Sequence, residues 1–175
     1  LEEGLYQHRY LSFLEFSTLP KSLLENLGEN FTLFPLELSK TITYRDKQTQ
    51  KFHFELHDGS YIESVLMHYE GRHTVCISTL VGCPMGCVFC ATGGMGFIRN
   101  LTAGEILAQI IFAMRQLERE GMNLTNVVYM GMGEPFLNYD HVMSSIARLT
   151  DQKGLNFGAR RLTISTVGIL PRIHQ

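Results

Sequence analysis

Three cysteines fall within eight residues, in the run Cys83-Pro-Met-Gly-Cys87-Val-Phe-Cys90. Closely spaced thiolates on one short loop can converge on a single iron–sulfur cluster, because iron prefers soft sulfur ligands. A 4Fe–4S cluster held by only three thiols leaves its fourth iron open. S-adenosylmethionine (SAM) can fill that position through its amino and carboxylate groups, and an electron from the cluster can then cleave a carbon–sulfur bond. The spacing therefore predicts a 4Fe–4S cluster that binds SAM and generates an adenosyl radical.

A structural zinc site is the alternative, with Cys76 or His73 as the fourth ligand. Structural zinc sites favour two Cys-x2-Cys-like pairs separated by a dozen or more residues. Cys76 instead lies seven residues upstream of Cys83, inside an apolar run typical of a strand. A buried strand cysteine more often serves packing alone. The spacing thus favours iron–sulfur over zinc.

The elements that must position this motif begin with a helical segment. Residues 1–38 carry apolar side chains at helical spacing, for example Leu23, Leu24 and Leu27, and Gly28 is a plausible helix stop. We expect residues 1–38 to be the remnant of a small helical N-terminal accessory domain.

Residues 39–73 change to a period of two. Phe52 and Phe54 alternate with polar residues, Asp58-Gly59 supplies a turn signal, and residues 61–67 continue as a second strand. The pattern predicts a β-hairpin extension.

From residue 74 the pattern becomes strand, loop and helix, and it repeats. Thr102 and Glu105 form a capping box before an apolar helix face that Gly121 can close. Strands are expected at 74–78, 126–130 and 161–166, and a second helix at 139–149. Strands that alternate with helices predict an α/β fold with parallel β/α units, here the first three strands of a barrel or open sheet. Residues 74–175 would form this unit, with an unpaired edge.

Composition places the chain among globular proteins of the cytoplasm. Hydrophobic residues make up 45% and charged residues 18%. No run approaches the roughly 18 consecutive apolar residues of a membrane span, and no secretory signal is seen. The net charge of -2 gives no global basic footprint for nucleic acid. Because the chain begins at Leu1 and stops at Gln175 just after a strand-like run, we expect a fragment of a longer protein.

Several further strings surround the cysteine motif at characteristic separations. They are Asp58-Gly-Ser-Tyr-Ile-Glu63, Ala91-Thr92-Gly93, Gly96-Phe97, Arg99-Asn100-Leu101, Met130-Gly-Met-Gly-Glu-Pro135 and Ser165-Thr166. In this combination the sequence, from about Leu5 onward, resembles the radical-SAM adenine-C2 methyltransferases of ribosomal and transfer RNA (the RlmN/Cfr family). The resemblance implies a partial radical-SAM (β/α) barrel and a dual-specificity enzyme that acts on 23S rRNA and tRNA.

By position, the resemblance assigns Gly133, Glu134 and Ser165 to SAM binding. A glycine lets the backbone approach a ligand, and a carboxylate at the C-terminal end of a strand can accept from the SAM amino group. Without the resemblance, Gly133 and Glu134 would equally suit a simple turn after a strand.

The resemblance also assigns Glu63 as the proton acceptor. On an alternating strand Glu63 shares a face with Tyr61, Val65 and Met67, and desolvation among such apolar neighbours would favour the neutral acid and suit it to proton transfer. By residue type alone, Glu63 would be a solvated edge acid.

The implied chemistry is methylation of an adenine carbon that is a poor nucleophile. The family places a methyl group on a cysteine first, and an adenosyl radical then activates it, so one SAM donates the methyl group and another supplies the radical. The implied partners are RNA with an exposed adenine and a reductase such as flavodoxin or ferredoxin. We expect a monomer with no membrane association.

Two departures and several alternatives accompany the resemblance. No cysteine follows Cys90, so the methyl-carrying cysteine is absent and this chain alone is expected to be inactive. Thr79-Leu80 stands where many members have Ser-Gln. Methylation at C8, another radical-SAM reaction on a substrate other than RNA, and a zinc-stabilised binding module stay open. Scattered arginines (Arg99, Arg160 and Arg161) could face RNA phosphates, but are more often surface or ion-pair residues.

Overall fold

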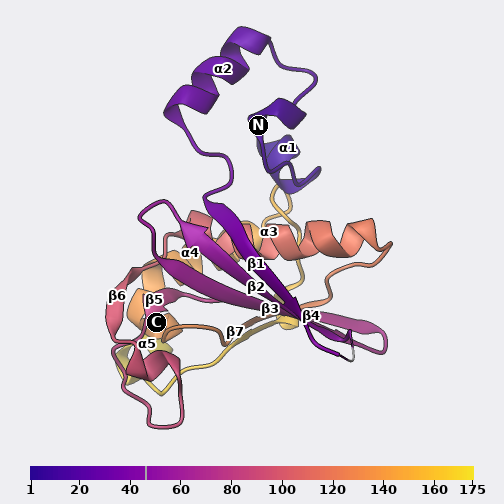
Figure 1. Ribbon diagram of the computed structural model, residues 1–175. Coiled ribbons are helices and arrows are strands. Elements are labelled where there is room, and N and C mark those ends of the chain that lie inside the picture. The colour runs from indigo at the N-terminus through magenta and orange to yellow at the C-terminus, as the bar shows by residue number, and fades with distance from the viewer. Residues whose placement is uncertain (46) are drawn as a thin grey trace.

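A six-stranded sheet with the order β1-β2-β3-β4-β7-β8 runs through the molecule (Figure 1). The computed structural model describes residues 1–45 and 47–175. The sheet strands are β1 (Leu36–Thr43), β2 (Thr49–Leu56), β3 (Tyr61–Tyr69), β4 (Arg72–Cys76), β7 (Asn126–Tyr129) and β8 (Leu162–Ile164). The α-helices are α1 (Glu2–Tyr6), α2 (Lys21–Asn30), α3 (Ala103–Arg119), α4 (Tyr139–Thr150) and α5 (Leu170–Ile173). None of the helices in the described part of the chain is long and apolar enough to cross a bilayer.

Strand β4 pairs antiparallel with β3 on one side and parallel with β7 on the other. Strands β1 to β4 are an antiparallel meander, whereas β4, β7 and β8 run parallel, joined through α3 and α4. The predicted α/β fold with three parallel strands and intervening helices is confirmed, as is the edge position of the third strand. The carboxyl ends of β4, β7 and β8 therefore meet at one edge of the sheet, where parallel folds usually place ligands.

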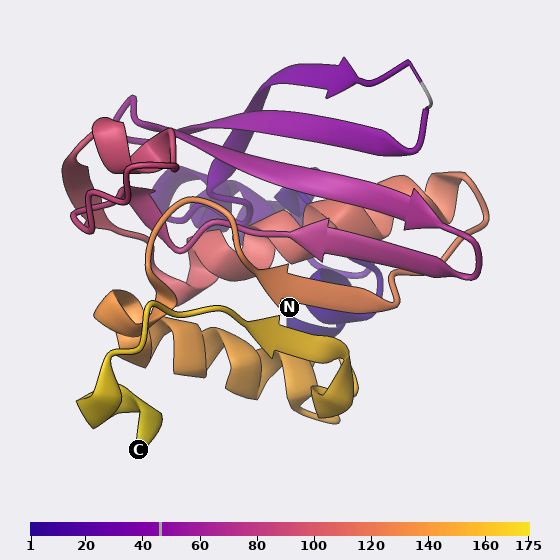
Figure 2. The same ribbon diagram turned by 90° about the horizontal axis from the view of Figure 1, so that it is seen from below.

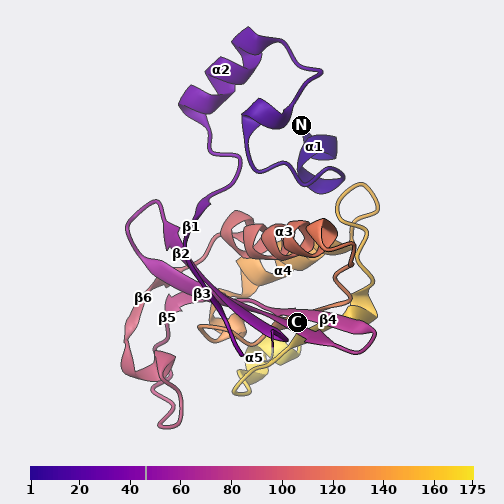
Figure 3. The same cartoon turned by 45° about the vertical axis from the view of Figure 1, so that its right-hand side comes forward.

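Helix α3 covers one face of the antiparallel part. Its apolar face is buried, and the Phe112 ring meets the rings of Phe52 and Phe54 edge-on, each with centroids 5.1 Å apart. The predicted capping box is present, because the Thr102 side chain accepts from the Glu105 amide and the Glu105 side chain accepts from the Thr102 amide. Figure 3 shows α3 and α4 on the same side of the sheet, which leaves the opposite face free of these helices.

The predicted hairpin is confirmed but is incomplete. Strands β2 and β3 pair across the Asp58-Gly59 turn, with His53 opposite Glu63. Strand β1 escaped prediction because a register irregularity between Leu38 and Lys40 interrupts its alternation and most of its residues are exposed.

The N-terminal helices lie to one side of the sheet (Figure 1). The expected helix around Leu24 is α2, but Gly28 does not stop it, because the helix continues to Asn30. A Cβ atom at Gly28 would meet nothing within 4 Å, so this glycine has no packing constraint.

Candidate functional site

The cysteine loop connects the two strands of a β-ribbon that the sequence analysis did not predict. Strands β5 (Leu80–Gly82) and β6 (Phe97–Asn100) pair antiparallel and bring the two ends of the loop together. At its mouth the Cys83 amide donates to the Gly96 carbonyl over 2.8 Å. Gly82 has a φ of +71°, and a Cβ atom there would collide with the Gly96 carbonyl oxygen. The ribbon therefore requires a glycine at this crossing.

Within the loop, the three thiols differ in exposure. Cys83 is buried, Cys87 is half-buried and Cys90 is exposed. Hydrogen bonds from the backbone amides of Gly93 and Thr92 lower the pKa of the Cys90 thiol. A lowered pKa favours the thiolate, which is the form that ligates metal. Figure 2 shows this loop projecting at one end of the sheet strands.

The three thiols lie on one loop, but they do not form a preformed metal site. In residues 1–45 and 47–175, no three cysteine, histidine, aspartate or glutamate side chains are grouped so that they could hold a metal ion. The donor set still suits an iron–sulfur cluster in type, because three thiols lie on one short glycine-containing loop.

The fourth ligands considered for zinc lie elsewhere. Cys76 is part of β4, where it pairs with Val65 of β3 and Val128 of β7, and burial raises the pKa of its thiol. His73 faces His68, with 3.2 Å between their Nδ1 atoms. Both residues belong to the sheet and its hairpin rather than to the cysteine loop.

Glu134 joins the loops that follow β7 and β8. Its carboxylate is buried and accepts from the Thr166 hydroxyl (2.7 Å) and from the backbone amides of Val167 (2.8 Å) and Phe136 (3.0 Å). The structure thus brings together the two strings that were singled out for SAM, residues 133–134 and 165–166. Ser165 itself is exposed beside this junction.

Gly133 allows the loop after β7 to approach the chain that leads to the cysteines. Its φ is +105°, and a Cβ atom there would lie 2.6 Å from the Leu80 Cβ and Cγ atoms. Leu80 is completely buried in this contact. Gly131 is similarly close, since a Cβ atom would lie 2.7 Å from the Ile77 carbonyl carbon.

Glu63 does not have the apolar surroundings expected for it. It lies on the sheet face opposite α3, and its Oε2 atom is 2.9 Å from the Lys51 Nζ atom. His53 places Nδ1 at 3.5 Å from the other carboxylate oxygen. The expectation of desolvation among apolar neighbours is wrong, because the neighbouring strand β2 supplies polar partners. The hydrogen bond that Lys51 donates to the Glu63 carboxylate raises the pKa of Lys51.

Several buried polar residues were missed by the sequence analysis. Ser64 and Ser78 each donate a hydrogen bond to the Gln109 side-chain oxygen, and all three residues are almost completely buried. Asn138, also buried, donates to the Thr79 and Leu101 carbonyls. The available signal was a glutamine inside the apolar helix face that includes Ile106 and Ile110.

Arg99 is committed to ion pairs within the chain. Its guanidinium donates to both oxygens of the buried Glu105 carboxylate, at 2.8 and 2.9 Å, and to Asp58 at 2.5 Å. These bonds connect β6, the start of α3 and the β2–β3 turn. Of the two roles considered for Arg99, the structure shows the ion-pair role.

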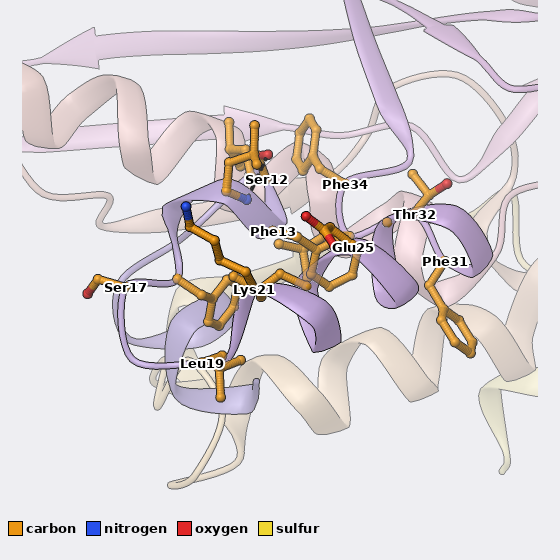
Figure 4. Close-up of a pocket in the computed structure, with 15 residues that line it drawn as sticks. Ser12, Phe13, Ser17, Leu19, Lys21, Glu25, Phe31, Thr32 and Phe34 are labelled. Carbon is orange, nitrogen blue, oxygen red and sulfur yellow. Dashed lines mark hydrogen bonds between the residues drawn. The ribbon is translucent and has the colours of Figure 1, made fainter.

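A hollow of about 790 Å³ lies between α2 and the short 3-10 helix Phe13–Glu15 (Figure 4). Its wall is mainly apolar, with Phe13, Leu19 and Phe34 among its lining residues, and Lys21 and Glu25 add charge. None of the cysteines or acidic residues discussed above lines it.

Known proteins are similar in sequence to this chain over almost its whole length. A "probable dual-specificity RNA methyltransferase RlmN" of Bacillus velezensis is 46% identical over 173 residues, which is 99% of this chain and 47% of that protein. A "dual-specificity RNA methyltransferase RlmN 1" of Myxococcus xanthus is 48% identical over 172 residues, covering 98% of this chain and 48% of that protein. The chain thus spans about half the length of the curated relatives it matches.

A solved structure shares the fold. The crystal structure of a radical SAM methyltransferase from Sphaerobacter thermophilus superposes with a TM-score of 0.96 at 45% sequence identity, covering 98% of this chain and 50% of that one. The family model described as "Radical SAM superfamily" matches residues 77–175, more than half of the chain. This region contains the cysteine loop and the parallel strands β7 and β8. The chain belongs to the radical SAM superfamily, whose cofactors are a 4Fe–4S cluster and S-adenosylmethionine.

Proposed function

We propose that this chain is the cofactor-binding part of an RNA methyltransferase of the RlmN type, which methylates C2 of an adenine in 23S rRNA and tRNA. The observation that carries the proposal is the meeting of three loops at the carboxyl edge of β4, β7 and β8. One carries the cysteines, one carries Gly133 and Glu134, and one carries Ser165. The likeness to the RlmN relatives over 98–99% of the chain supports the RNA substrate.

In this proposal Cys83, Cys87 and Cys90 hold the cluster. The lowered pKa of Cys90 favours its thiolate form, and the hydrogen bond from the Cys83 amide to the Gly96 carbonyl closes the loop that carries all three cysteines. When bound, the cluster and SAM supply a one-electron cleavage that yields an adenosyl radical. The protein's part is to hold the two groups together and exclude other ligands.

Gly133, Glu134 and Ser165 form the proposed SAM side of the site. Gly133 lets its loop pack closely against Leu80, three residues before the first cluster cysteine. Glu134 already accepts three protein hydrogen bonds, so its main contribution is to fix the two loops relative to each other. Each carboxylate oxygen has two lone pairs, and acceptor capacity for the SAM amino group remains.

Glu63 is the proposed proton acceptor. A carboxylate can act as a general base, and the Lys51 ammonium group, 2.9 Å from one oxygen of Glu63, fixes the position of the side chain. Glu63 lies on the sheet face that carries Cys76 and Val128, two strands away from the β7 loop. A base stacked over this face would present its carbon to the carboxylate.

The RNA and protein partners follow from this chemistry. The substrate base must leave its stack, so an unpaired adenine of 23S rRNA or tRNA is the expected target. A methylated cysteine carries the methyl group before transfer, and a flavodoxin or ferredoxin reduces the cluster. The enzyme is expected to act as a monomer.

The experiment measures methyl transfer to RNA by the full-length protein that contains this chain. The protein is reconstituted anaerobically and incubated with SAM carrying a deuterated methyl group, a reductant, and unmodified 23S rRNA or tRNA. Nucleoside mass spectrometry should find 2-methyladenosine with wild type and a stalled reaction with Glu63→Gln. Methyl groups at C8, or in no RNA nucleoside, would contradict the C2 proposal. Undiminished turnover by Glu63→Gln would remove the role of Glu63.

A further inference from the structure

Strand β4 leaves its antiparallel neighbour at the point where the proposed site begins. The β3–β4 ladder ends at the pair Val65 and Cys76, and the chain then follows β7, with the Ile77 amide donating to Val128 and the Gly131 amide to Ile77. The sheet therefore divides into an antiparallel branch that carries Glu63 and a parallel branch that leads to the cysteine loop. Backbone groups at such a division lose their ladder partners and need others.

Ser78 supplies those partners at the division. Its side-chain hydroxyl donates to the Glu63 carbonyl over 2.6 Å and accepts from the Met132 amide over 2.9 Å. One hydroxyl group thus bonds the strand of the proposed base and the loop that contains Gly133 and Glu134. Ser78 is completely buried, so water does not compete for these bonds.

Gln109 of α3 fixes Ser78 in turn. Its side chain accepts from the Ser78 amide (2.8 Å) and donates to the Ser78 carbonyl (3.0 Å). The Gln109 amide group thus bonds both backbone polar groups that a neighbouring strand would otherwise pair. The Ser64 hydroxyl donates to the same Gln109 oxygen over 2.7 Å. Ser78 therefore has both backbone polar groups and its hydroxyl occupied.

We infer that Ser78, held by Gln109, is a positioning residue that fixes Glu63 and the Met130–Pro135 loop relative to each other at the division of the sheet. This inference rests on the proposed function, since it names the device that aligns the proposed base with the proposed SAM loop. Ser78 acts through hydrogen bonds to backbone atoms and touches no reacting atom. Its hydroxyl group, rather than its size, carries the role.

Three substitutions separate the contribution of the Ser78 hydroxyl from that of packing. Ser78→Thr and Ser78→Val add the same volume, but only Ser78→Thr keeps the hydroxyl. Thr79→Val is the matched control, because the neighbouring Thr79 hydroxyl is also buried but has no hydrogen-bond partner among residues 1–45 and 47–175. Its removal leaves no partner group unpaired.

The first measurement is the SAM dissociation constant of the anaerobically reconstituted protein, together with the change that SAM produces in the electron paramagnetic resonance of the reduced cluster. Ser78→Val should weaken SAM binding about tenfold and diminish the spectral change, whereas Ser78→Thr and Thr79→Val should stay within about twofold of wild type. Wild-type affinity in Ser78→Val, or equal losses in Ser78→Val and Thr79→Val, would overturn the inference.

The second measurement needs neither cofactor nor variant. In the wild-type chain, the Met132 amide should exchange with solvent deuterium about as slowly as the amides of the neighbouring strand β7, although Met132 lies in a loop. Exchange at the rate of an open loop would overturn the inference even if Ser78→Val fails to fold. A wild-type protein that binds no cluster would instead refute the proposed function, and slow exchange at Met132 would still support the Ser78 link.

Discussion

At the scale of single residues, Glu63 shows what a one-strand pattern leaves out. Alternation along β3 correctly places Glu63 on the sheet face opposite to that of Ser64. It does not predict which residues of the neighbouring strand lie beside Glu63. The register with β2 brings Lys51 and His53 to the two carboxylate oxygens. The surroundings of a strand residue are set by pairing, which the sequence of that strand does not contain.

Lys51 gives a test of these surroundings. Lys51→Met should lower the rate of RNA methylation about tenfold, because the Glu63 carboxylate loses the ammonium group that lies 2.9 Å from it and fixes its position. Lys51→Arg should retain most of the rate. The check is kcat/KM for RNA methylation, with Lys40→Met on strand β1 as control. A wild-type kcat/KM in Lys51→Met would contradict the assignment.

Gly133 tests the close packing of its loop. Gly133→Ala must accommodate a Cβ atom 2.6 Å from the Leu80 side chain at a φ of +105°. We expect a loss of about 2 kcal/mol in the free energy of unfolding by urea.

Gly28→Ala is the matched control for this substitution. Gly28 lies within α2, and a Cβ atom there meets nothing within 4 Å. This substitution should stabilise the chain by up to about 1 kcal/mol. Equal effects of the two substitutions would show that the contact with Leu80 is not tight.

At the scale of elements, the β5–β6 ribbon is held to α3 and to the β2–β3 turn by Arg99. Glu105 is 2% exposed, so removal of Arg99 leaves a buried carboxylate without its guanidinium partner and with only the hydrogen bonds from Thr102. Arg99→Met should therefore cost about 3 kcal/mol in the free energy of unfolding. Arg148→Met is the control, because Arg148 is half exposed and its carboxylate neighbours are 3.6 and 3.8 Å away. We expect a change within about 0.5 kcal/mol there.

The same ion pairs predict a pH dependence of stability. Hydrogen bonds from Arg99 and from the Ser60 amide lower the pKa of Asp58, and at Glu105 burial opposes ionisation but the bonds from Arg99 and Thr102 outweigh it and lower the pKa. A carboxyl group with a lowered pKa in the folded state stabilises the fold above its ordinary value near about 4, and this stabilisation is lost as the pH falls further. Urea unfolding from pH 7 down to pH 3 should show the loss, and Arg99→Met should flatten it. An unchanged acid limb in Arg99→Met would refute the contribution of Arg99.

Elements with strong local signals could be predicted from the sequence, and those made by long-range pairing could not. Helix α3 was foreseen from its capping box and apolar face, and β7 from its apolar run. The β5–β6 ribbon was missed because its strands are short and because one of them, β6, is largely exposed. Gly28 was misleading as a helix-stop signal, because α2 continues past it to Asn30.

At the scale of the whole molecule, the sheet combines an antiparallel meander with the start of a parallel barrel, and β4 belongs to both. The sequence indicated each part, through its period of two before residue 74 and its strand–helix alternation after it. It did not indicate that the two parts share one sheet, nor that Ser78 and Gln109 occupy the division. Buried polar pairs such as these are specified by three-dimensional contacts between segments 31 residues apart.

The most direct test of the central claim is the iron, sulfide and SAM content of anaerobically reconstituted protein. Wild type should bind about four irons and four sulfides per chain, and SAM should alter the magnetic resonance of the reduced cluster. Separate replacement of Cys83, Cys87 and Cys90 by alanine should abolish both, whereas Cys76→Ala should leave both intact. Unchanged metal content in the three loop variants, or zinc in place of iron and sulfide, would contradict the account.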